Sequence, residues 1–104
     1  EMNVGLFYLK RKQYSAAINR FRVVIEDFQT TSHTPEALHR LVECYLSLGL
    51  YKEAETAAAI LGHNYQSSEF YRDSYELLNQ KGLVPNVQKK SWLNKFYQNI
   101  VKGD

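Results

Sequence analysis

Three histidines and one cysteine are the side chains best suited to metal binding or nucleophilic chemistry: His33, His39, His63 and Cys44. A metal site needs several converging ligands, and His39 and Glu43, four residues apart, could share a helical face but supply only two. A catalytic thiolate needs a neighbouring histidine or a helix N-terminus. Nothing around Cys44 indicates either. We therefore expect solvated or helix-capping histidines and a buried free thiol.

Motifs of enzyme active sites are not found in the sequence. It has no glycine-rich phosphate loop, no nucleophile elbow and no paired acidic motif. The acidic pairs Glu26-Asp27 and Glu53/Glu55 have the spacing of surface charges on helices. We therefore predict a protein without enzymatic activity, cofactor, metal or small-molecule substrate.

Basic side chains offer a different chemistry, the recognition of a partner's carboxylates. Lys10, Arg11 and Lys12 form a cluster at a predicted turn, and Asn19 and Arg20 lie on the polar side of the next helix. Such a cluster is either a solvated helix end or a partner-binding corner. Arginine is the residue best suited to a bidentate contact with a carboxylate at an interface. These five residues are the candidate partner-binding site.

The C-terminal segment carries the excess positive charge. Residues 81–104 hold five lysines against one aspartate, a net charge of +4, whereas residues 1–80 hold eight basic and ten acidic side chains. Trp92, Phe96 and Ile100 share one face of a predicted basic amphipathic helix. This helix could cap the fold, dock in a partner's groove or lie on an anionic membrane, so these three residues form a possible second partner surface. Binding of nucleic acid is not expected from so few lysines.

The elements that must position these residues are helices. Apolar residues recur at steps of three and four along most of the chain, and no segment alternates as a strand would. Thr34 is expected to cap a helix with Pro35 in its first turn, and Gly49 to end it. The predicted helices cover 2–12, 14–28, 34–48, 51–65, a segment from Ser67 or Ser68 to Gly82, and 89–102, with a linker at 83–88 broken by Pro85.

An internal repeat organises these helices. A shift of 37 residues aligns Tyr8 with Tyr45, Ala17 with Ala54, and further pairs of similar type, and a third partial copy begins near residue 70. The small alanine lets two helix backbones approach closely. Each copy follows the tetratricopeptide pattern, whose usual period is 34; a longer turn accounts for the difference.

The fold class predicted is therefore all-α: a tetratricopeptide-type solenoid of helical hairpins, with two repeats plus extra C-terminal helices. Residues 1–82 are expected to be the C-terminal repeats of a longer solenoid. Residues 83–104 are expected to be a linker and a basic amphipathic helix. Because Glu1 is not a methionine and Met2, Leu6 and Phe7 lie at the start, we expect upstream repeats to cover this end. A chain without them is expected to self-associate there.

Three stretches resemble the BamD family, tetratricopeptide lipoproteins of the bacterial outer-membrane β-barrel assembly machine. Residues 3–21 (NVGLFYLKRKQYSAAINRF) look like its penultimate repeat. Residues 36–50 are similar to its last repeat, and residues 64–71 to the exit from that repeat. The resemblance covers roughly residues 2–80, and the tail 83–104 matches no motif of the family.

The resemblance implies a scaffold that supports the insertion of β-barrel proteins. It implies a position at the periplasmic face of the outer membrane, with a lipid anchor upstream of this sequence. The implied partners are the periplasmic region of the barrel subunit BamA and small lipoproteins of the same machine. By position, Arg20 with Asn19 belongs to the surface that faces BamA. The alternative is a tetratricopeptide adaptor that binds another protein or peptide.

Overall fold

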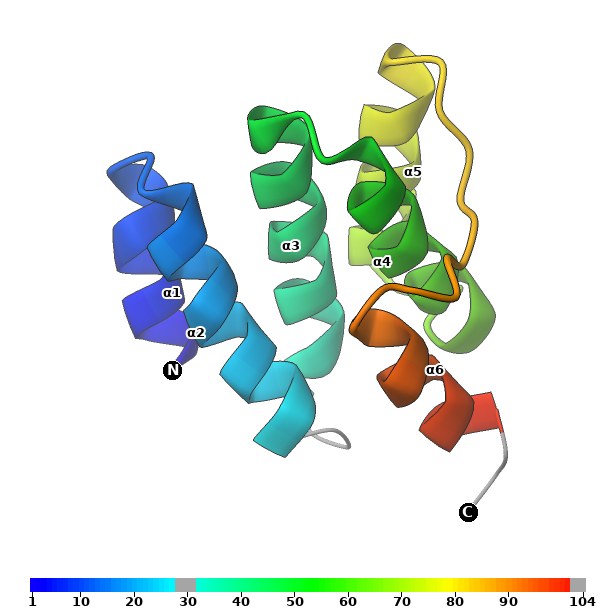
Figure 1. Cartoon of the computed structure of the whole chain (residues 1–104), viewed down its shortest axis with the longest axis horizontal. Coiled ribbons are helices and arrows are strands. Elements are labelled where there is room, and N and C mark those ends of the chain that lie inside the picture. Colours follow the sequence, from blue (N-terminus) through cyan, green and yellow to red (C-terminus); the bar gives the residue numbers. More distant parts are fainter. Residues whose placement is uncertain (28–31, 102–104) are drawn as a thin grey trace.

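The computed structural model describes residues 1–27 and 32–101, without the side chains of residues 100 and 101. Within these residues the fold is all-helical, as predicted. Figure 1 shows two helical hairpins side by side, a fifth helix beyond them, and a chain that returns to place a sixth helix below. The helices are α1 (Met2–Lys10), α2 (Tyr14–Asp27), α3 (Thr34–Leu48), α4 (Tyr51–Asn64), α5 (Glu69–Gln80) and α6 (Leu93–Val101).

The two hairpin turns are equivalent under the 37-residue repeat. Gly49 ends α3 in the left-handed conformation, with a φ of 75°, which glycine adopts without a steric penalty. The equivalent residue in the first turn is Lys12, and it has a φ of 60°. A side chain in this conformation is strained by roughly 1 kcal/mol. The backbone therefore keeps the same turn in both copies although the residue type differs.

The core lies between successive hairpins. Ala17 and Ala54 are fully buried, as expected of small residues packed between helices. Gly5 of α1 lies directly against the ring of Phe21, since a β-carbon built on Gly5 would be 2.5 Å from Phe21 Cε1. The repeat places Val42 and Ala58 at the equivalent positions, both fully buried. The large residue thus sits on the second helix in one copy and on the first helix in the other.

Two helix starts differ from the prediction. Thr34 is the first residue of α3 rather than its cap, and His33 occupies the N-cap position. Ser68 caps α5 as expected, because its hydroxyl accepts a hydrogen bond of 3.1 Å from the Phe70 N–H. Helix α6 begins at Leu93, four residues later than predicted, where the Ser91 hydroxyl accepts from the Leu93 N–H at 3.1 Å.

The predicted linker is bound to the body of the protein. Thr56, fully buried in α4, accepts a hydrogen bond from the Gln88 N–H at 3.0 Å and lies 3.2 Å from the Asn86 carbonyl oxygen. The Asn86 N–H donates to the Glu55 carbonyl at 3.1 Å, and the Ser91 hydroxyl donates to the Glu53 carboxylate. The segment therefore works as a strap that holds α6 close to α4.

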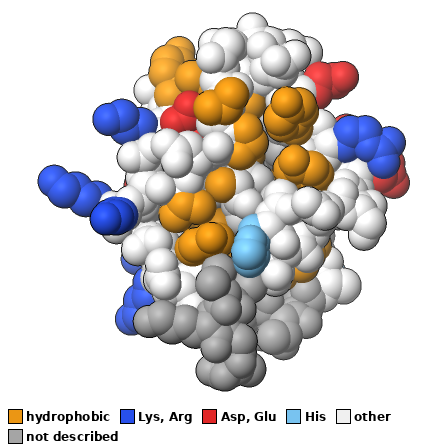
Figure 2. All heavy atoms as spheres, turned by 90° about the vertical axis from the view of Figure 1, so that its right-hand side faces the viewer, with side chains coloured by type: hydrophobic (Ala, Val, Ile, Leu, Met, Phe, Trp, Pro, Cys, Tyr) orange, Lys and Arg blue, Asp and Glu red, His pale blue; other side chains and the backbone are white. Residues whose placement is uncertain are grey.

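The two ends of the stack expose apolar side chains. On α1, Phe7 is 51% exposed, but Met2 is only 9% exposed and belongs to the core, which corrects part of the expected open face. Hydrophobic side chains also gather on the opposite side of the molecule (Figure 2). Tyr75 of α5 and Val84 after it are exposed as well.

Candidate protein-binding surface

The predicted basic cluster lies at the tip of the first hairpin. Lys10 is the last residue of α1, Arg11 and Lys12 form the turn, and all three are exposed. The Arg11 guanidinium lies 4.6 Å over the ring of Phe7. This cation–π contact holds one of the three charges in place against the helix.

Asn19 and Arg20 lie together on the exposed side of α2. They line a shallow hollow of about 230 Å³, which Tyr8 of α1 shares with Ala16 and Val23. The hollow has a polar rim and a partly apolar wall. The hollow lies between α1 and α2.

Arg20 already has one weak partner. Its Nη1 lies 3.4 Å from Glu1 Oε1, and the two side chains are 44% and 34% exposed. An ion pair this exposed contributes little stability. The guanidinium can therefore exchange Glu1 for a carboxylate of another protein at small cost.

The structure separates the five predicted residues into two groups. Lys10, Arg11 and Lys12 do not line the hollow that holds Asn19 and Arg20. Arg20 lies eight residues beyond Lys12, which corresponds to roughly 12 Å along a helix. The two groups thus occupy the tip and the flank of one hairpin rather than a single pocket.

The three residues of the predicted second surface differ in exposure, since Phe96 is buried and Trp92 is half-buried. Phe96 is 3% exposed and packs in the core, so it is not a surface residue. The Trp92 indole N–H donates a 2.8 Å hydrogen bond to the Tyr45 hydroxyl. The side chain of Ile100 lies outside the described residues. Leu93 and Phe96 of α6 are therefore covered by the protein itself, whereas Trp92 remains partly accessible.

One contact in this region was not predicted. The Arg22 guanidinium lies 4.5 Å over the ring of Trp92 and 3.1 Å from the Glu26 carboxylate. Arg22 and Trp92 are 70 positions apart, and nothing local in the sequence indicates that they meet. Only the return of the strap brings α6 to α2.

A buried polar cluster joins α3 to α5. His39 is 5% exposed, which corrects the expectation of a solvated or capping histidine. Its Nδ1 is 2.7 Å from the Ser74 hydroxyl, and its Nε2 is 3.6 Å from the Glu43 carboxylate. Burial lowers the pKa of His39, against the neighbouring Glu43 charge, which raises it. Ser74 is fully buried, whereas the Glu43 side chain is 31% exposed, so the cluster joins α3 to α5 with its histidine and serine inside the protein and its carboxylate at the surface.

Among the other candidate reactive groups, Cys44 is buried, whereas His33 and His63 are exposed. Cys44 is fully buried, as predicted, and burial raises its pKa to about 12, so it holds its proton at neutral pH. In the part of the chain that the structure describes, no three His, Cys, Asp or Glu side chains gather to hold a metal ion. Nor does any helix there have the length and apolarity needed to cross a membrane.

The fold defines a class of protein: a helical-hairpin repeat protein, here with exposed basic side chains at the tip of its first hairpin. Comparison with known proteins gives the family. The family described as Outer membrane lipoprotein (YfiO) matches residues 1–60, and the chain belongs to this family.

Individual relatives agree with this result. The chain is 56% identical to the Outer membrane protein assembly factor BamD of Caulobacter vibrioides over 88 residues, 85% of this chain and 29% of the relative. It is 53% identical to that of Rickettsia prowazekii over 78 residues, 75% of this chain and 31% of the relative. Identity to the Neisseria meningitidis protein is 33% over 76 residues, 73% and 28% of the two chains. The chain spans about three tenths of the length of these curated relatives. No solved structure matches it.

Proposed function

We propose that this chain is a protein-binding part of an outer-membrane protein assembly factor and acts as a scaffold without catalysis. The observation that carries the proposal is the 56% identity, over 85% of the chain, to a protein named for that role. The buried state of His39, Ser74 and Cys44 supports a binding role, since none of these groups is accessible for chemistry.

The proposed partner is the periplasmic region of a BamA-like barrel subunit, with small lipoproteins of the same machine as further partners. The contact surface is the first hairpin, with Arg20 and Asn19 at its centre and Lys10, Arg11 and Lys12 at its tip. Arg20 supports this role because it is 44% exposed and has only a weak ion pair to lose. The hollow beside it accepts a neighbouring apolar side chain of the partner.

The proposed location is the periplasmic face of the bacterial outer membrane, with the protein anchored by a lipid attached upstream of this sequence. A stack of hairpins fits this role because it holds a binding face at a fixed orientation. The strap and α6 add to that rigidity by closing over α4.

The test is a calorimetric titration of this chain with the periplasmic domains of the BamA-like subunit from the same organism. Arg20→Glu is the test variant, and Arg72→Glu is the matched control. Arg72 is an exposed arginine on α5, and α3 and α4 lie between α5 and the first hairpin (Figure 1). We expect Arg20→Glu to weaken binding at least tenfold, a loss of about 1.4 kcal/mol, because it replaces an attraction with a repulsion.

Two outcomes would contradict the proposal. Equal losses for Arg20→Glu and Arg72→Glu would show a general effect of charge and remove Arg20 from the contact. No binding of the unchanged chain would reject a BamA-like partner for these repeats.

A further inference from the structure

The surface feature that the proposed function leaves unused is a hollow between the end of α2 and α6. It measures about 260 Å³ and is lined by Glu26, Trp92, Lys95, Phe96 and Asn99. Its lining combines two aromatic rings with an ammonium, an amide and a carboxylate group. This combination fits a segment with an apolar side chain beside a carboxylate.

The floor of the hollow is fixed in position. The Trp92 ring is held on its nitrogen edge by the 2.8 Å hydrogen bond to the Tyr45 hydroxyl, and on its face by the Arg22 guanidinium at 4.5 Å. Phe96 beside it is 3% exposed. A preformed aromatic surface loses little conformational entropy when a ligand packs on it.

The strap and α6, which form one side of the hollow, carry only positive charges. Residues 81–101 contain no Asp or Glu, and the exposed Lys89, Lys90 and Lys95 follow one another along the strap and α6. Among the described residues no carboxylate lies within 4.0 Å of these three ammonium groups. On the α2 side, Glu26 is paired with Arg22 at 3.1 Å, and its neighbour Asp27 is exposed.

The burial of α6 decides between two kinds of anionic partner. A helix that lies on a membrane inserts its apolar face among the lipids. Here Leu93 and Phe96 are 0% and 3% exposed, so the apolar face is already used inside the protein. What remains outside is a lysine-bearing polar face beside a small hollow, which favours an acidic segment of a protein.

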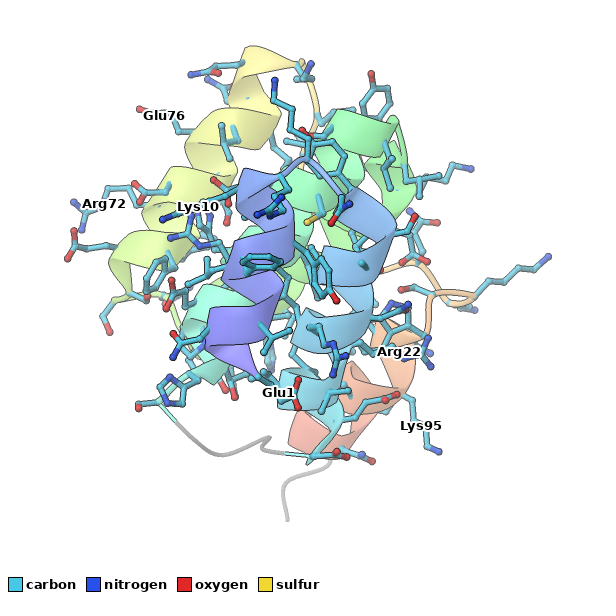
Figure 3. The ribbon with its side chains drawn as sticks, turned by 90° about the vertical axis from the view of Figure 1, so that its left-hand side faces the viewer. Glu1, Lys10, Arg22, Arg72, Glu76 and Lys95 are labelled. Atoms are coloured by element: carbon cyan, nitrogen blue, oxygen red, sulfur yellow. The ribbon has the colours of Figure 1, made fainter. Side chains whose placement is uncertain are left out.

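We propose that the α2–α6 hollow binds an acidic protein segment, with a carboxylate at Lys95 and Arg22 and a neighbouring apolar side chain against Trp92. Figure 3 shows Arg22 and Lys95 on the same side of the molecule, with Lys10 and Arg72 elsewhere. The site is separate from the hollow at Asn19 and Arg20, so this proposal can be tested independently of the proposed function.

The experiment uses the chain itself and the peptide Asp-Glu-Phe-Asp-Glu, with Asn-Gln-Phe-Asn-Gln as its uncharged counterpart. Trp92 is the only tryptophan of the chain, so its fluorescence reports directly on the hollow. We expect saturable binding of the acidic peptide that changes this fluorescence and weakens with added salt. The uncharged peptide is expected not to bind.

Matched variants locate the site. Lys95→Gln and Arg22→Gln are each expected to weaken binding about fivefold, the effect of one exposed charge pair. Lys81→Gln and Arg72→Gln, which remove exposed charges of the same kinds elsewhere, leave it unchanged. Asp27→Asn is expected to tighten binding. Calorimetry accompanies the fluorescence because Arg22→Gln alters the surroundings of Trp92 itself.

Three results would overturn the proposal. The first is no saturable binding of the acidic peptide to the unchanged chain. The second is equal weakening by Arg72→Gln and Arg22→Gln. The third is preferential binding of phosphatidylglycerol vesicles through Lys95 with a blue shift of Trp92 fluorescence, which would make a lipid surface the partner.

Discussion

The contact between Gly5 and Phe21 gives the sharpest test of how the first hairpin is packed. A β-carbon at Gly5 would lie 2.5, 2.8 and 2.9 Å from three ring carbons of Phe21. Distances this short require a neighbour to move. Phe21 is fully buried, so its ring has no free space to move into.

The change in the free energy of unfolding on Gly5→Ala is the difference between a gain in helix propensity and a cost of overpacking. Alanine in a helix interior is favoured over glycine by about 1 kcal/mol. Overpacking of a well-filled core costs about 1–3 kcal/mol. For Gly5→Ala we expect a net loss of about 1 kcal/mol in the free energy of unfolding. In a chain of this size that lowers the melting temperature by about 4–8 °C.

Gly62 provides the matched control. A β-carbon there would lie 2.8 Å from Tyr71 Cε1, an overlap similar to the one at Gly5. Tyr71 is only half-buried, however, so its ring can turn away toward solvent. We therefore expect Gly62→Ala to be neutral or to stabilise by up to about 1 kcal/mol.

The assay is urea unfolding of both variants, followed by far-ultraviolet circular dichroism. Phe21→Leu added to Gly5→Ala should recover stability relative to the sum of the single changes, by about 1 kcal/mol, since it makes room for the methyl group. A Gly5→Ala protein as stable as the wild type, at an unchanged slope with urea, would refute the packing argument. So would equal losses at Gly5 and Gly62.

Four further predictions follow from single contacts. His39 has a lowered pKa in the folded state, so it contributes stability above about pH 6.5 that is lost on acidification. The urea midpoint of the wild type should therefore fall more between pH 7 and pH 5 than that of His39→Gln. A smaller fall for the wild type would show that Glu43 controls the titration. Lys12→Gly should raise the free energy of unfolding by about 0.5–1 kcal/mol by relieving the positive φ, and Lys12→Gln, which removes only the charge, should not. Thr56→Val keeps the side-chain shape but leaves the Gln88 N–H without its acceptor. We therefore expect the free energy of unfolding to fall by about 1–3 kcal/mol and the amides of the strap to exchange faster. Unchanged amide exchange would contradict the role of Thr56 in holding the strap. Self-association through α1 should appear as a concentration-dependent sedimentation coefficient that Phe7→Glu abolishes, and a monomer at every concentration would end this expectation.

Local sequence patterns were enough to predict the helices and their order. The three- and four-residue steps, Gly49 and Ser68 identified the main elements to within a few residues, because these features act within one turn of helix. The 37-residue repeat also indicated the pairing into hairpins. The start of α6 was placed four residues too early because the apolar pattern continues through Trp92, which lies outside the helix.

The candidate site was predictable only in part. Exposure of Arg20 and Asn19 follows from their place on the polar side of α2, and the structure agrees. The hollow they share with Tyr8 depends on how α1 lies against α2. Phe96 illustrates the opposite case, since an apolar stripe predicts that a face is covered but not by which partner. Here the covering surface belongs to the same chain.

The sequence by itself determined the helical class, the repeat and the placement of charge, because each depends on residue types within a few turns. Only the tertiary structure decided which distant residues meet. The strap brings Trp92 to Tyr45 and Arg22, 47 and 70 positions away along the chain, and packing of α5 on α3 buries His39 against Ser74. Such contacts form through the fit of whole elements, so a pattern that describes one helix at a time carries no record of them.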